Sequence, residues 1–222
     1  MEFRIQDITD STLAFNFSNS IDEEVNKHIN ILINYLNEND LDLLSVYPTY
    51  NSLIVTYNPL LTERKEIIQL VEKLNKLEKN YNKAKDQILN IPVNYGGKYG
   101  EDLEEVSKIL SISEEQIIDI HSSKPYYVFM IGFSPGFPYL GGMDKRLYCP
   151  RLEPPRINIQ KGSVGIAGKQ TGIYPSESPG GWRIIGRSPI ELFNINNESP
   201  ALISSRTYVK FIPISEKNIS KF

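Results

Sequence analysis

The sequence predicts an α+β protein of two domains, a small ferredoxin-like domain over residues 1–85 and a β-barrel domain over residues 86–222. Three observations predict this. Helical and strand-like hydrophobic spacing alternate in the first third, polar residues interrupt the pattern at 79–86, and short β-rich segments follow residue 126. The length of 222 residues exceeds the ~100–200 usual for one domain and also favours two.

The N-terminal domain is predicted from strand-like and helix-like segments taken in order. Alternating apolar residues predict strands at 3–5 and 12–17, and an apolar helical stripe that opens on a capping-box pattern predicts a helix over 20–36. A hairpin follows over 43–57, and a second capped helix over 62–77. With a further strand, this is the order of a ferredoxin-like domain.

The C-terminal domain is predicted to begin with a strand and two short helices. The strand spans 88–93, and the helices span 101–110 and 113–120, the second opening on a capping box. Short β-rich pieces then alternate with Gly and Pro turns, which is typical of a closed or nearly closed β-barrel. These pieces span residues 126–131, 164–167, 182–185 and 208–212.

Composition excludes several classes of partner and compartment. A formal net charge of −3 provides no broad positive field, which argues against a nucleic-acid partner. Cys149 is the single cysteine, so neither an intramolecular disulfide nor a four-thiolate metal site can form. Apolar stretches fall far short of the ~20 residues needed to cross a bilayer. We therefore expect a soluble cytoplasmic protein with no membrane partner.

Two segments resemble catalytic motifs but lack their chemistry. Residues 132–136 match G-x-S-x-G, yet Pro135 has no N–H to serve as oxyanion donor, and both histidines precede Ser134. Residues 162–170 are glycine-rich like a phosphate loop, but the glycine spacing is wrong and Gln170 replaces the hydroxyl residue that would bind magnesium. We interpret the first as a turn and the second as extended chain.

Two further reactive side chains carry no assignment from sequence alone. Cys149 has no identifiable base nearby and is interpreted as an inert, partly buried thiol. His121 ends a predicted helix, where it either caps the last carbonyls as a cation or has a functional role. Metal-ligand spacings are missing from the sequence, so we predict no metal site and assign no catalytic residue.

Between residues 132 and 187, three segments combine glycine, proline and aromatic residues more densely than ordinary turns require. Together they predict one ligand-binding cleft with aromatic walls and a few directional polar groups, although tight barrel corners around a core tryptophan would give the same composition. The predicted substrate-binding residues are Phe137, Tyr139, Gln170, Thr171, Tyr174, Trp182 and Arg183.

Several long runs in these segments resemble the signature segments of the KipI-like family, also known as the first subunit of allophanate hydrolase or the B subunit of 5-oxoprolinase. They are IPVNYGGKYGEDLEEV, IIDIHS, GFSPGFPYLGG and GSVGIAGKQTGIYPSESPGGWRIIGRSP. The resemblance implies an N-terminal α+β domain followed by a cyclophilin-like β-barrel. It also implies a heteromeric partner, a KipA-like subunit.

The resemblance implies an enzyme subunit that is inactive alone. With the KipA-like subunit and a LamB/YcsF-like subunit, it would open the lactam of 5-oxoproline to L-glutamate at the expense of ATP. ATP would then act through the assembled complex, and no cofactor is indicated for the isolated chain. Two alternatives stay open: a binding module that inhibits a sensor histidine kinase, and a subunit of an allophanate- or urea-linked amide hydrolase or carboxylase.

Overall fold

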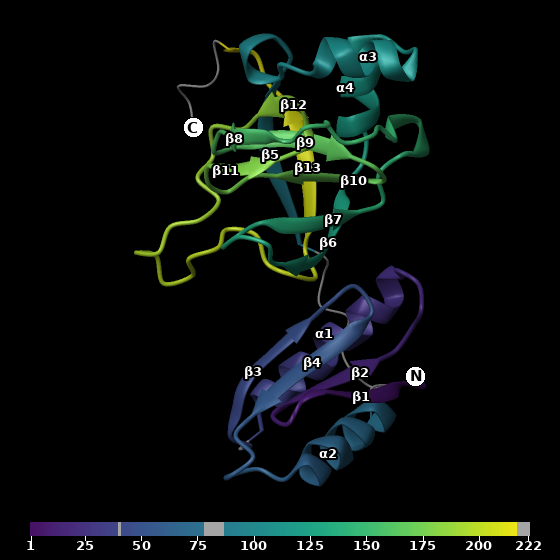
Figure 1. Ribbon diagram of the computed structural model, residues 1–222, viewed down its shortest axis with the longest axis vertical. Helices are drawn as coiled ribbons and strands as arrows, with labels where there is room; N and C mark the ends of the chain where they lie inside the picture. The colour runs from purple at the N-terminus through teal and green to yellow at the C-terminus, as the bar shows by residue number, and fades with distance from the viewer. Residues whose placement is uncertain (40, 78–86, 217–222) are drawn as a thin grey trace. The chain divides into compact units, whose positions relative to one another are not determined.

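The structure is a computed structural model that describes residues 1–39, 41–77 and 87–216. The chain forms two compact units, Met1–Lys85 and Asp86–Phe222 (Figure 1). The polar stretch 79–86, on which the predicted boundary rests, lies outside the described residues. In the described ranges, no helix is long and apolar enough to cross a membrane.

The N-terminal unit contains a four-stranded antiparallel sheet in the order β1-β2-β4-β3 and two helices. Its core is formed by apolar side chains of both helices together with those of β2 and β4. Each helix buries one apolar stripe, as its sequence periodicity predicts. The elements are β1 (Arg4–Thr9), β2 (Thr12–Asn16), α1 (Glu23–Asn37), β3 (Leu43–Pro48), β4 (Ser52–Tyr57) and α2 (Arg64–Leu77).

The ferredoxin-like order is not confirmed for this unit. Strands β1 and β2 pair directly as an antiparallel hairpin, because the two residues between them, Asp10 and Ser11, are too few for a crossover. The ferredoxin-like order also needs a final strand in this unit, but the next strand, β5 (Ile88–Tyr95), belongs to the barrel of the other unit, where the strand at 88–93 was predicted. Helix α1 also begins later than predicted, since its N-cap is Asp22, whose carboxylate accepts from the Val25 N–H at 3.0 Å.

The C-terminal unit contains a closed seven-stranded barrel in the order β10-β7-β6-β13-β5-β12-β9, as the turn-rich sequence predicts. Strands β13 and β5 run parallel, and the other neighbours are antiparallel. The remaining barrel strands are β6 (Tyr126–Ile131), β7 (Pro138–Gly141), β9 (Ser163–Ala167), β10 (Gln170–Ile173), β12 (Arg183–Arg187) and β13 (Tyr208–Pro213). A two-stranded sheet of β8 (Arg156–Ile159) and β11 (Ser178–Gly180) accompanies them.

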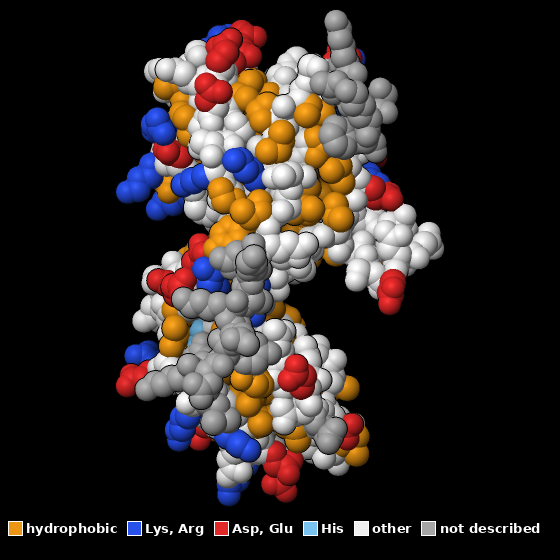
Figure 2. Space-filling view, turned by 180° about the vertical axis from the view of Figure 1, so that it is seen from behind, with side chains coloured by type: hydrophobic (Ala, Val, Ile, Leu, Met, Phe, Trp, Pro, Cys, Tyr) orange, Lys and Arg blue, Asp and Glu red, His pale blue; other side chains and the backbone are white. Residues whose placement is uncertain are grey.

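Helices α3 (Leu103–Leu110) and α4 (Glu114–Ser122) lie together at one end of the barrel (Figure 1). The predicted capping box of α4 is present, with Ser113 and Gln116 each bonding to the other's backbone N–H. Both helices contribute buried apolar side chains to the barrel core. Charged side chains of both signs appear on each unit on the face shown in Figure 2.

His121 lies in the barrel core and does not cap α4, so its predicted capping role is wrong. The imidazole is fully buried, and its Nδ1 and Nε2 lie 2.7 Å from the hydroxyls of Tyr95 and Thr171. Because the Thr171 hydroxyl donates to the carbonyl of Gly165 at 3.1 Å, it accepts from Nε2–H, and Nδ1 accepts from Tyr95. Burial lowers the pKa of His121 from 6.5 to about 3, which keeps the ring neutral.

Candidate functional site

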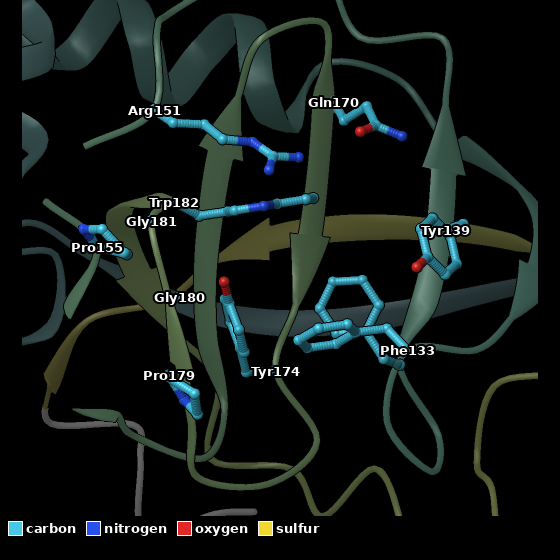
Figure 3. A pocket seen from close by; sticks show the side chains of 11 residues that line it. Phe133, Tyr139, Arg151, Pro155, Gln170, Tyr174, Pro179, Gly180, Gly181 and Trp182 are labelled. Atoms are coloured by element: carbon cyan, nitrogen blue, oxygen red, sulfur yellow. The ribbon is translucent and has the colours of Figure 1, made fainter. Parts of the chain in front are cut away.

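A cavity of about 380 Å³ opens in the C-terminal unit, within the range of about 300–1,000 Å³ usual for ligand pockets. Figure 3 shows its lining side chains. They come from the β6–β7 loop, β7, β10, the β10–β11 connection, β11, the β11–β12 connection and the segment before β8. They are Phe133, Phe137, Tyr139, Arg151, Pro155, Gln170, Tyr174, Pro179, Gly180, Gly181 and Trp182.

The aromatic wall of this cavity is organised around Phe137. Its ring makes edge-to-face contacts with Phe133, Tyr139 and Tyr174, each at a centroid separation of 5.5 Å. The indole of Trp182 completes the set at 5.8 Å and 87°. Such perpendicular pairs are the favoured aromatic geometry and hold each ring in a defined orientation. The wall is therefore shaped by ring packing before any ligand binds.

Two glycines leave room for these rings. A Cβ at Gly172 would lie 3.0 Å from Trp182 Cζ3 and 3.2 Å from Phe137 Cζ, so the rings pack directly over the β10 backbone. A Cβ at Gly180 would lie 2.6 Å from the Tyr174 hydroxyl, closer than real Cβ atoms approach. Glycine at these positions follows from the close approach of side chains to backbone.

Phe133 stands at the outer end of the aromatic wall. Its side chain is 68% exposed, and its backbone has a φ of 67°, a conformation uncommon for a bulky residue. The β6–β7 loop thus holds one large apolar ring toward solvent at the cavity, where it covers part of the Phe137 ring.

Two polar side chains and the phenol of Tyr174 stand out in the chemistry of the cavity. Arg151 is the only charged residue among those lining the cavity, and Gln170 provides an amide. Burial raises the pKa of Tyr174 to about 12, although the charge of Arg151 opposes this rise. The Tyr174 hydroxyl therefore stays protonated at neutral pH and can donate a hydrogen bond. The cavity can bind a small molecule that has an apolar body and an anionic end.

The structure brings five of the seven predicted site residues together and places two elsewhere. Phe137, Tyr139, Gln170, Tyr174 and Trp182 line the cavity. Thr171 and Arg183 do not. Successive side chains of a strand point to opposite faces, so with Gln170 facing the cavity, Thr171 faces the barrel interior and His121.

Arg183 lies under the site and not in it. Its side chain is buried, and Nη1 lies 2.9 Å from Glu105 Oε1 on α3, aligned as an ion pair and not as a hydrogen bond. Its Nε–H donates to the carbonyl of Pro150 at 2.9 Å. Because Pro150 precedes the lining residue Arg151, Arg183 supports one wall of the cavity.

Sequence reasoning missed several lining residues. Phe133 lies within the run GFSPGFPYLGG that predicted the cleft, so it could have been predicted as a lining residue in the same way as Phe137. Arg151, in contrast, lies between the runs GFSPGFPYLGG and GSVGIAGKQTGIYPSESPGGWRIIGRSP, in a stretch with no motif. It reaches the cavity only because hydrogen bonds fix its segment against the barrel.

The motifs set aside on chemical grounds have the expected local structure. Ser134 lies in a turn followed by the strand β7, where a nucleophile elbow would require a helix. Residues 163–173 form the β9–β10 hairpin, and the next element of the described chain is the strand β11, where a phosphate loop would lead into a helix. Cys149 is buried in the barrel core, and burial raises the pKa of its thiol. Within the described ranges, no three His, Cys, Asp or Glu residues cluster as metal ligands.

The model of the carboxyltransferase domain, subdomain C and D, matches residues 3–203 of this sequence. The chain belongs to this family. The 5-oxoprolinase B subunit of Bacillus subtilis strain 168 is 39% identical over 233 residues, with 98% of this chain and 95% of that protein covered. The corresponding B subunit of Haemophilus influenzae is 41% identical and covers 79% of this chain and 81% of its own length. These relatives confirm the family resemblance seen in the signature runs.

More distant relatives and solved structures agree with this membership. A urea amidolyase of Saccharomyces cerevisiae is 28% identical over 52% of this chain and 7% of its own length. A conserved uncharacterized protein from Pyrococcus horikoshii is 42% identical, covers 97% of this chain and 100% of its own, and superposes with a TM-score of 0.59. The structure of TTHA0988 gives a TM-score of 0.82 at 31% identity, with 92% of this chain and 40% of that chain covered.

Proposed function

We propose that this chain is a subunit of a heteromeric, ATP-dependent 5-oxoprolinase that opens 5-oxoproline to L-glutamate. Its partners would be a KipA-like subunit and a LamB/YcsF-like subunit. The observation that carries the proposal is the identity of 39% and 41% to two 5-oxoprolinase B subunits over most of both chains.

The composition of the cavity supports a role as a subunit that binds but does not complete the chemistry. Opening a lactam by hydrolysis requires a nucleophile or an activated water and a group that moves a proton. The residues described as lining the cavity are aromatic, aliphatic, amide and guanidinium groups, without carboxylate, thiol or imidazole. In this proposal the reactive groups come from the other subunits.

ATP in this proposal acts through the assembled complex. The glycine-rich segment that resembles a phosphate loop is the β9–β10 hairpin, so it presents no helix N-terminus to a phosphate. The chain would supply the pocket and its partners the nucleotide site.

Reconstitution of the three purified subunits tests the proposal. The complex is expected to release glutamate from 5-oxoproline only with ATP, and omission of this chain should abolish the release. This chain alone should release none. Glutamate formation by the chain alone at the rate of the complex, or equal formation by the complex when this chain is omitted, would contradict the proposal.

A second candidate is a subunit of an allophanate- or urea-linked amide hydrolase or carboxylase. The match to a urea amidolyase over 52% of this chain favours it, although at 28% identity. The same reconstituted complex, supplied with urea or allophanate in place of 5-oxoproline, distinguishes the two. Turnover of those substrates and not of 5-oxoproline would favour this second function.

A further inference from the structure

Arg151 brings a positive charge to the rim of an apolar cavity. In Figure 3 its guanidinium reaches over the Trp182 indole on the same side of the cavity as Gln170. The side chain is exposed, and among the described residues it has no acidic partner. Other arginines near the barrel are paired, for example Arg156 with Asp102 and Arg183 with Glu105. An unneutralised guanidinium beside aromatic rings is suited to an anionic group of a ligand.

The backbone on both sides of Arg151 is fixed. The Cys149 carbonyl accepts from the Gly168 N–H at 2.6 Å, and the Pro150 carbonyl accepts from Arg183 Nε at 2.9 Å. The Leu152 N–H donates to the Gly181 carbonyl at 2.7 Å. The bonding partners lie two residues before Gln170 and on either side of Trp182. The position of Arg151 is therefore fixed relative to both of these residues.

The two polar groups at this rim have complementary capacities. A guanidinium presents its N–H groups as a planar fork that pairs with both oxygens of a carboxylate. A primary amide offers donors and an acceptor, which match the C=O and N–H of another amide. Aromatic faces below can cover a small ring.

We infer that Arg151 binds the carboxylate of a small cyclic amido acid and that Gln170 bonds to its ring amide, with the ring lying against the aromatic wall. This rests on the proposed function, because 5-oxoproline is a five-membered lactam that carries one carboxylate. Arg151 thereby selects a lactam acid over the same lactam without its acid group.

Binding of two probes tests this assignment, both in the full chain by titration calorimetry and in the reconstituted complex. The probes are 5-oxoproline and 2-pyrrolidinone, which has the same ring without the carboxylate. The wild type should prefer 5-oxoproline. Arg151→Met should weaken 5-oxoproline binding by about 10- to 100-fold and leave the affinity for 2-pyrrolidinone unchanged. Arg151→Lys should recover only part of the loss, because an ammonium lacks the planar fork.

Lys169→Met is the matched control. Lys169 is an exposed cation next to Gln170 that does not line the cavity, so its removal tests the general effect of one charge. It should change 5-oxoproline affinity by no more than about twofold. Thermal unfolding followed by Trp182, the single tryptophan, verifies that each variant is folded.

Three outcomes would overturn the inference. They are equal losses for Arg151→Met and Lys169→Met, equal weakening of both probes by Arg151→Met, and a wild type that does not prefer 5-oxoproline. Turnover separates this inference from the proposed function. If the wild-type complex releases glutamate and Arg151→Met keeps the same KM, only the assignment of Arg151 fails. If the wild-type complex releases none, the proposed function fails whatever Arg151 does.

Discussion

His121 should make the stability of the barrel depend on pH. In the folded protein its pKa is about 3, whereas its ordinary value is 6.5, so between these values only the unfolded chain takes up the proton. Lowering the pH through this window therefore favours unfolding, and raising it restores stability. Each pH unit below 6.5 costs about 1.36 kcal/mol. At pH 5 the loss from this residue is about 2 kcal/mol relative to pH 7.

Urea denaturation at pH 7 and pH 5, followed by the fluorescence of Trp182, measures this loss. The probe is specific because Trp182 is the single tryptophan and lies in the barrel unit. His121→Gln lacks the titrating ring, so the difference between its free energies of unfolding at the two pH values should be about 2 kcal/mol smaller than in the wild type. His28→Gln, which removes the other histidine, in the N-terminal unit, should keep the wild-type difference.

An equal pH effect in the wild type and in His121→Gln would refute the reasoning. Because this variant removes a ring with two buried hydrogen bonds, it could fail to fold, and a second measurement on the wild type covers that case. The imidazole NMR signals of His121 should not titrate between pH 7.5 and pH 5. A midpoint near 6.5 would show that burial does not keep the ring neutral.

Two further predictions follow from neighbouring positions of β10. Gly172→Ala should lower the free energy of unfolding of the barrel by about 1–3 kcal/mol in the same urea assay, because its Cβ would press on the Trp182 ring. Gly132→Ala is the control: the nearest atom to its Cβ would be 3.5 Å away, so its free energy of unfolding should stay within about 0.5 kcal/mol of the wild type. Gln170→Ala should weaken 5-oxoproline binding by about 5- to 150-fold at an unchanged melting temperature. Thr171→Val should lower the melting temperature and leave 5-oxoproline binding unchanged, because it leaves the buried His121 Nε2–H unpaired. Calorimetric titration measures 5-oxoproline binding by the Gln170 and Thr171 variants, and thermal melts measure their stability. A melting temperature lowered by Gln170→Ala would show that Gln170 has a structural role.

Local signals predicted the barrel better than the N-terminal unit. The run Tyr126–Ile131 and the capping box at Ser113 were recovered because alternation and capping are encoded within a few residues. The pairing of β1 with β2 was missed, since apolar alternation predicted the two strands at 3–5 and 12–17 without assigning either a partner. The short connection at Asp10 and Ser11 could have corrected this, because two residues can join only antiparallel neighbours.

The candidate site shows a similar division. Aromatic density located the wall around Phe137, but the choice of both Gln170 and Thr171 ignored the alternation of side chains along a strand. Strand period alone allows only one of two adjacent residues to face the cavity. Arg151 could not be found in this way, because its position depends on hydrogen bonds to residues far along the chain, such as Gly181.

Arg183 was predicted to line the cavity, but it lies beneath the cavity and supports its wall. This support depends on the geometry of the guanidinium group. The guanidinium presents Nη1 to Glu105 on α3 and Nε to the Pro150 carbonyl, two partners in different directions from one rigid plane. A lysine has a single point charge and could satisfy only one of them well. Because Pro150 is bonded to the next residue, Arg151, the surface helix α3 is linked by one side chain to the charged rim of the cavity. The tryptophan–arginine pair in the sequence therefore combines two tasks: Trp182 forms part of the wall, and Arg183 fixes the neighbouring segment from which Arg151 reaches over the indole (Figure 3).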